Sequence, residues 1–79
     1  MIAKIHVTLK SAVLDPQGKA VLHALESLNF NEVQDVRIGR FIELKLKEED
    51  RAKAEKRVKE MCEKLLANTV IESYQCEIL

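Results

Sequence analysis

Residues 2–9 read IAKIHVTL, and apolar and polar side chains alternate along this stretch. Ala3, Ile5, Val7 and Leu9 share one parity, whereas the residues between them are charged or polar. Such alternation predicts a β-strand with one covered and one wet face, which is typical of an antiparallel sheet. The rest of the chain must therefore supply neighbouring strands and a layer over the apolar face.

A first helix is predicted to begin at Asp15-Pro16. Asp15 can accept backbone N–H bonds at the N-cap, and Pro16 suits the first helical position, where no donor is needed. Apolar residues then recur at steps of three and four: Val21, Ala24, Leu25 and Leu28. Residues 29–31, with sequence NFN, are expected to end the helix, because Asn tolerates the left-handed backbone conformation.

A second extended segment is predicted from about Val33 to Leu46, with apolar residues on one parity. Arg40 shares that parity, so an ideal strand would direct its guanidinium into the core. Gly39 leaves two alternatives open. The segment is either a long bent strand with a bulge that re-aims Arg40, or a hairpin whose two-residue turn begins at Gly39.

A second helix is predicted to open at Glu48-Glu49-Asp50, because acidic groups there meet the positive end of the helix dipole. Its apolar stripe consists of Ala54, Val58, Met61, Cys62, Leu65 and Leu66. Asn68 is expected to cap its C-terminus. A last strand, Val70 to Ile78, follows less cleanly, since Glu72 lies on its apolar parity.

The two halves of the chain follow one order: strand, acidic cap, helix, Asn turn, strand. We therefore expect one domain over residues 1–79, with an α+β fold built on a βαβ-type pseudo-repeat. In this two-layer sandwich, two helices cover one face of a small antiparallel sheet. Phe41 falls on the other face among charged residues, which indicates that part of this face packs on another subunit. A chain of 79 residues has a thin core, so further burial is expected to come from another chain.

The composition argues against several kinds of partner. With 13 basic and 13 acidic side chains the net charge is zero, which disfavours nucleic acid and anionic lipid. No apolar run approaches the roughly 20 residues of a membrane span, and residues 1–10 lack the apolar block of a signal peptide. Cys62 and Cys76 are not in a CxxC motif and are interpreted as reduced thiols, so a cytoplasmic location is expected.

No catalytic constellation stands out in the sequence. His6 and His23 have no Cys or carboxylate at metal-ligand spacing, and Cys62 falls on a buried helical stripe. Gly18 and Gly39 are the only two glycines, so a Gly-rich phosphate loop is excluded. We expect no catalytic residue, no cofactor-binding residue and no metal ligand in this chain.

Two segments are candidates for partner contact. Asp15-Pro16-Gln17-Gly18 is either a plain helix cap or a place of close approach, because Gly is a poor choice for a first helical turn unless a backbone or ligand comes near. Residues 35–40, with sequence DVRIGR, are either surface ion pairs or a docking surface. The candidate interface residues are Asp15, Pro16, Gln17, Gly18, Asp35, Arg37, Gly39 and Phe41.

Three segments, in this order and spacing, resemble the PurS family, the small subunits of the multi-subunit phosphoribosylformylglycinamidine synthase of purine biosynthesis. They are residues 13–18 (VLDPQG), 31–39 (NEVQDVRIG) and 61–72 (MCEKLLANTVIE). Each motif alone is weak, but the ordered set is specific. Residues 47–59 and 75–79 add nothing to the resemblance.

The resemblance implies a non-catalytic subunit of a glutamine-dependent C–N ligase. Such a subunit bridges a glutaminase subunit and a large synthetase subunit and supports ammonia transfer between them. It also implies a homodimer or tetramer that binds no cofactor itself, although the complex uses ATP, Mg and glutamine. The residues alone leave an alternative, a small ferredoxin-like ligand-sensing or regulatory module; nucleic-acid binding is disfavoured by the neutral charge and the lack of paired aromatics.

Overall fold

The computed structural model describes all 79 residues. Three strands, two α-helices and one π-helical turn follow each other along the chain. They are β1 (Ile2–Leu9), α1 (Pro16–Ser27), β2 (Gly39–Lys45), α2 (Arg51–Met61), the π-helical turn η1 (Cys62–Leu66) and β3 (Glu72–Ile78). No helix is both long and apolar enough to cross a membrane.

The strands form one antiparallel sheet with β1 in the centre, in the order β2-β1-β3. Ile5 of β1 lies opposite Ile42 of β2 and Cys76 of β3. Along β1 the predicted alternation is confirmed: Ile5 and Val7 are buried, whereas His6 is exposed. An α+β fold on a small antiparallel sheet is therefore confirmed.

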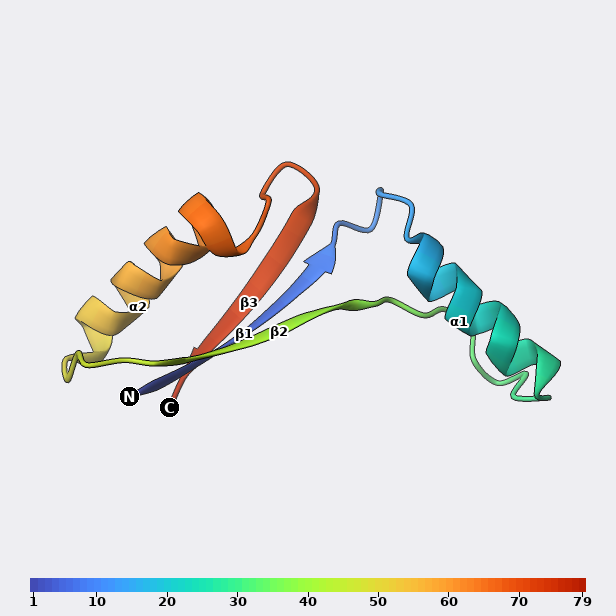
Figure 1. Ribbon diagram of the computed structural model, residues 1–79, viewed down its shortest axis with the longest axis horizontal. Helices are drawn as coiled ribbons and strands as arrows, with labels where there is room; N and C mark the ends of the chain where they lie inside the picture. Colours follow the sequence, from blue (N-terminus) through green and yellow to red (C-terminus); the bar gives the residue numbers. More distant parts are fainter.

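Helix α2 covers one face of this sheet (Figure 1). Its side chains Ala54 and Val58, with Cys62 of η1, are buried together with Ile5 and Val7 of β1. Only 10 of the 79 residues are buried. The core is thus as thin as the length of the chain predicts.

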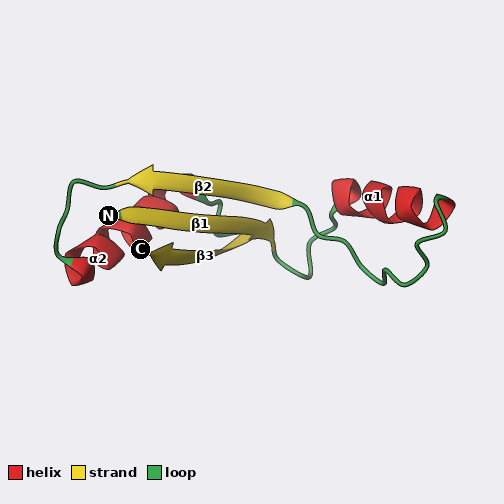
Figure 2. Ribbon diagram, turned by 90° about the horizontal axis from the view of Figure 1, so that it is seen from below, coloured by secondary structure: helices red, strands yellow, loops and turns green.

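Helix α1 lies beyond the end of the sheet and covers neither of its faces (Figures 1 and 2). The expectation that two helices cover one face is therefore wrong for the single chain. Residues 10–15 carry the chain past the end of β1 before α1 begins, and Gly18 in the first turn of α1 lies against Val36 of the returning segment instead. As a result Val21 and Leu28 of its apolar stripe stay 39% and 65% exposed, and the molecule extends over 48 × 24 × 14 Å.

The hairpin at Gly39 is wrong, because β2 is one unbroken strand; the single strand of the other alternative forms, but without a bulge and only over Gly39–Lys45. Its register with β1 runs unbroken from Ile2 opposite Lys45 to Thr8 opposite Gly39. Arg40 does point to the covered face, where its Nη2 donates to the Leu66 carbonyl and the Glu72 carboxylate, both at 2.9 Å. The guanidinium finds partners at the end of the sheet, so the strand needs no distortion to re-aim it. Strand pairing begins at Gly39 rather than Val33.

The end of the second helix differs from the prediction. The last turn is π-helical and leaves Leu65 82% exposed, so Leu65 does not belong to the buried stripe. Ala67 ends the turn, one residue before the predicted cap, and its N–H donates to the Cys62 carbonyl. Asn68 instead organises the turn into β3 by accepting a hydrogen bond from the Val70 N–H.

Candidate functional site

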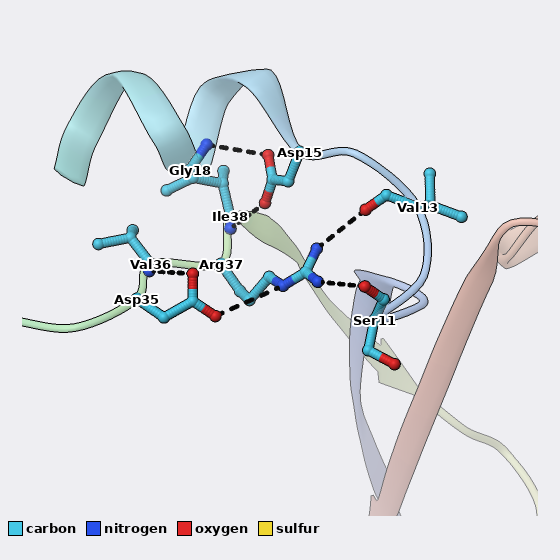
Figure 3. Close-up of polar contacts among 8 residues, drawn as sticks. All are labelled: Ser11, Val13, Asp15, Gly18, Asp35, Val36, Arg37 and Ile38. Atoms are coloured by element: carbon cyan, nitrogen blue, oxygen red, sulfur yellow. Dashed lines mark hydrogen bonds and ion pairs between the residues drawn. The ribbon is translucent and has the colours of Figure 1, made fainter. Parts of the chain in front are cut away.

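The two segments singled out in the sequence meet at one junction, shown in Figure 3. Asp15 is 6% exposed and lies between the start of α1 and the chain that leads into β2. Its Oδ1 accepts the Gly18 N–H and its Oδ2 accepts the Ile38 N–H, each at 2.9 Å. One carboxylate therefore caps α1 and also ties the helix to the segment before β2.

Hydrogen bonds to the carboxylate stabilise its charged form. The N–H of Ile38 lowers the pKa of Asp15 below its ordinary value of 3.8, and the N–H of Gly18 and the Arg37 charge add to this effect against the opposing cost of burial. The side chain of Asp15 is thus an anion at neutral pH. It acts as the N-cap of α1, and as a carboxylate it accepts hydrogen bonds and donates none.

Gly18 packs directly against the backbone of the returning segment. A Cβ atom at Gly18 would lie 2.2 Å from the Val36 carbonyl oxygen and 2.8 Å from the Asp15 carboxylate. No side chain fits at this distance, which explains the glycine in a first helical turn. Of the two causes considered for this position, the close approach of a backbone is confirmed.

Arg37 fastens the loop between β1 and α1. Its Nη2 donates to the Ser11 carbonyl at 2.8 Å and its Nη1 to the Val13 carbonyl at 3.2 Å (Figure 3). Its Nε lies 4.0 Å from the Asp35 carboxylate. A guanidinium has several N–H donors in a fixed plane, which suits it to bridge two carbonyls. Asp15 and Arg37 thus both tie the segment before β2 to the start of α1 and the loop that precedes it.

The candidate interface residues are not equally accessible. Asp15 and Gly18 are buried within the junction, whereas Pro16, Gln17, Asp35 and Arg37 are exposed. Gly39 lies beside the junction, where a Cβ would approach the Val7 carbonyl oxygen to 2.2 Å. Phe41 is separate from the others, on the open face of the sheet, 55% exposed and with its ring 4.9 Å from that of His6. Contact of these residues with a partner stays a prediction.

Several structural contacts escaped sequence reasoning. The N–H of Ile38 and the carbonyl of Val36 act through the backbone, which no residue type reveals. The hydrogen bond from the Tyr74 hydroxyl to Glu63 at 2.8 Å, which raises the pKa of Tyr74 to about 12, joins η1 to β3. The sequence could not predict this contact without knowledge of the π-helical turn that places Glu63.

The groups at the junction cap a helix and position two segments of backbone. No three His, Cys, Asp or Glu side chains gather where they could hold a metal ion. Burial raises the pKa of the Cys62 thiol, which keeps it protonated and unreactive. The two cysteines are not joined to each other.

Comparison with known proteins places this chain in a family. Residues 2–79 match the sequence profile of PurS, described as phosphoribosylformylglycinamidine (FGAM) synthase. The subunit PurS of this synthase from Bacillus subtilis is 61% identical over 75 residues, which are 95% of this chain and 88% of that protein. The subunit PurS from Synechocystis is 51% identical over 75 residues, 95% of this chain and 75% of that protein.

Solved structures agree with the sequence match. The purS subunit from Thermotoga maritima superposes with a TM-score of 0.90 at 35% identity, over 99% of this chain and 90% of that one. A chain in the structure of PurLQS from the same organism gives 0.86 at 33% identity, over 100% of this chain and 99% of that one. This chain therefore belongs to the PurS family of phosphoribosylformylglycinamidine synthase subunits.

Proposed function

We propose that this chain is the non-catalytic subunit that bridges the glutaminase and the large synthetase of a multi-subunit phosphoribosylformylglycinamidine synthase. The observation that supports this most is its match, over its full length, to a chain of the PurLQS structure. The groups of the junction cap a helix and tie two segments together, which suits a subunit that works by holding others. The alternative, a ligand-sensing module, is not favoured by the comparisons.

Bridging has a chemical use in a reaction that passes ammonia between two active sites. Ammonia released into water at neutral pH is mostly protonated, and the ammonium ion is no nucleophile. A subunit that holds glutaminase and synthetase together keeps the reactive form away from solvent. The chain would bind no cofactor of its own in this role, while ATP, Mg and glutamine serve the other subunits.

The junction has the properties of a docking surface. Pro16 and Gln17 are exposed at the start of α1, and Asp35 and Arg37 are exposed on the returning segment. The buried Asp15 fixes the two segments to each other. Because the geometry of these segments is set before any partner binds, association costs little conformational entropy. We propose that this rigid surface contacts a larger subunit, and that Phe41 marks a second contact on the open sheet face.

The proposed setting is the cytosol, and the proposed working form is a homodimer or tetramer. Both cysteines are free thiols, as in proteins of reducing compartments. The exposed apolar residues of α1 support association with further chains.

Reconstitution tests the bridging role. The cognate synthetase and glutaminase are assayed with and without this chain, once with glutamine and once with ammonium salt as the nitrogen donor. We expect the chain to be required with glutamine and dispensable with ammonium, which needs no transfer between subunits. A full glutamine-dependent rate in its absence would overturn the proposal.

A further inference from the structure

Strand β3 forms one edge of the sheet, and its outer side is free (Figure 2). Leu79 and Ile2 exchange both of their backbone hydrogen bonds, so in an antiparallel ladder the odd-numbered residues of β3 face β1. The backbone N–H and C=O groups that point outwards are therefore those of Glu72, Tyr74, Cys76 and Ile78.

The chain itself closes this edge at both ends. At the start of β3, the Glu72 N–H donates to the Asn68 carbonyl at 2.7 Å. At its end, the Ile78 carbonyl accepts Nη1 of Arg51 at 2.8 Å. Between these two points the outward backbone groups have no partner within the chain. The open stretch is long enough to pair with a strand of about five residues.

The sequence of β3 does not protect this edge. Proteins commonly protect an edge strand with Lys or Pro, with a bulge, or by making the strand very short. Strand β3 has seven residues and contains neither Lys nor Pro. Its register with β1 runs without a bulge from Ile78 opposite Ala3 to Glu72 opposite Leu9. An unprotected edge of this kind is a template for the addition of a strand from another chain.

A groove lies beside the free edge, on the face of the sheet that α2 covers. Tyr74, Cys76 and Ile78 line it from β3, and Glu55 and Lys59 line it from α2. The opposite charges of Glu55 and Lys59 leave the groove without net charge, and its β3 side is an aromatic ring, a thiol and an aliphatic side chain. The groove therefore suits the apolar side chains of an added strand.

The open face of the sheet adds a requirement of charge. Glu43 of β2, Lys4 of β1 and Glu77 of β3 lie in one row across the sheet. Neither glutamate belongs to any of the three ion pairs of the chain. Two acids and one base leave this row with an excess of negative charge. A strand added beside β3 would continue the row, and a basic residue opposite Glu77 would balance it.

We propose that the free edge of β3 binds an extended segment of a larger subunit of the synthase. The segment adds a fourth strand to the sheet, alternates apolar and polar residues, and carries a basic residue opposite Glu77. Its backbone pairs with Tyr74 and Cys76, and its apolar side chains enter the groove beside α2. This inference rests on the proposed function, because the larger subunits are the partners that bridging requires. It adds the place and the chemistry of one contact.

Alkylation of Cys76 tests whether the edge is covered. Cys76 is exposed and Cys62 is buried, so N-ethylmaleimide should modify Cys76 first in the isolated chain. In the complex with the cognate synthetase and glutaminase, this reaction should slow at least about tenfold. The control is Lys56→Cys in a Cys76→Ala background, whose thiol lies on the exposed side of α2 and should react equally fast with and without the partners. Equal rates for Cys76 in the isolated and the bound chain would overturn the proposal.

Hydrogen exchange tests the backbone pairing. The amides of Tyr74 and Cys76 should exchange fast in the isolated chain and slow at least about 100-fold in the complex. The Lys47 amide, in the loop after β2, makes no backbone hydrogen bond and should stay fast in both. If the Tyr74 and Cys76 amides are already slow in the isolated chain, a second copy occupies the edge and the proposal is wrong.

Cys76→Pro tests the same pairing, because it removes one of the outward donors. No bond within the chain uses this N–H, and proline is tolerated at such a position of an edge strand. The variant should bind the larger subunits at least about tenfold more weakly, whereas Cys76→Ala, which keeps the N–H, should stay within about threefold of wild type. Circular dichroism verifies that both variants fold. Undiminished binding by folded Cys76→Pro would contradict the pairing.

The wild-type chain separates this inference from the proposed function. Its co-elution with both larger subunits supports the bridging role and does not depend on which surface they contact. Co-elution with Cys76 still freely reactive would overturn the β3 contact alone, whereas the absence of co-elution would overturn both.

Discussion

The Asp15 carboxylate accepts the backbone N–H of Ile38 at 2.9 Å, across 23 positions of sequence. The same carboxylate caps α1 through Gly18. Because both bonds come from one short side chain, the direction of α1 relative to β2 is fixed at this point. The junction therefore holds α1 away from its own sheet.

Replacing Asp15 with Asn should destabilise the chain, because an amide has only one acceptor oxygen for the two N–H groups. The effect should depend on pH. The pKa of Asp15 is lower in the folded state than its ordinary 3.8, so its contribution is fully present above that value and lost as the pH falls through the folded pKa. In urea unfolding at fixed protein concentration, the gap between wild type and Asp15→Asn should shrink below pH 3.8. A gap that is the same at pH 7 and below pH 3 would contradict this.

Gly18→Ala should cost about 1–3 kcal/mol of unfolding free energy, since the new Cβ would overlap the Val36 carbonyl oxygen, 2.2 Å away. The gain in helix propensity from Gly to Ala is about 1 kcal/mol and does not offset the clash. His23→Ala, on the exposed side of α1, is the control and should stay within about 0.5 kcal/mol of wild type. Chemical denaturation measures both, and a Gly18→Ala variant as stable as wild type would argue against the tight packing.

Arg37→Glu should weaken association with the larger subunits about tenfold while the secondary structure persists. The change removes the two bonds to the Ser11 and Val13 carbonyls and reverses a charge on the proposed docking surface. Co-elution with the partner subunits measures it, with Arg57→Glu on α2 as the matched control. If Arg37→Glu co-elutes as wild type does, the junction is not a docking surface.

Tyr74 is the only tyrosine, so its ionisation can be followed by ultraviolet absorbance. The Glu63 carboxylate accepts its hydroxyl and raises its pKa to about 12. Glu63→Gln should move the midpoint down towards 10.0. Because the folded pKa lies above the unfolded one, this contact stabilises the fold below pH 10.0 and is lost as the pH rises through the folded value. A midpoint that Glu63→Gln leaves unchanged would show that another group sets it.

The sequence was a good guide wherever local chemistry decides the structure. The alternation in residues 2–9 predicted β1 to the residue, and Asp15-Pro16 predicted the start of α1. Asn29, with φ of 69°, adopts the left-handed conformation expected at the end of that helix. Caps and periodicity depend on neighbours in the chain, so they can be recognised without the fold.

Long-range contacts decided what could not be predicted. Arg40 donates hydrogen bonds to Leu66 and Glu72, which lie 26 and 32 positions away in the sequence. Without knowledge of these partners, a bulge or turn at Gly39 seemed necessary to place the charge of Arg40. The predicted packing of α1 on its own sheet assumed that an apolar stripe is covered within one chain. At the candidate site, the sequence identified both segments, residues 15–18 and 35–40. It could not predict that they contact each other, because the contact uses the backbone N–H of Ile38 and the backbone carbonyl of Val36.

The ratio of glutamine-dependent to ammonia-dependent turnover in the reconstituted synthase tests the central claim most directly. The bridging account predicts that omission of this chain collapses the ratio, while ammonia-dependent turnover persists. An unchanged ratio after omission of the chain would contradict the account.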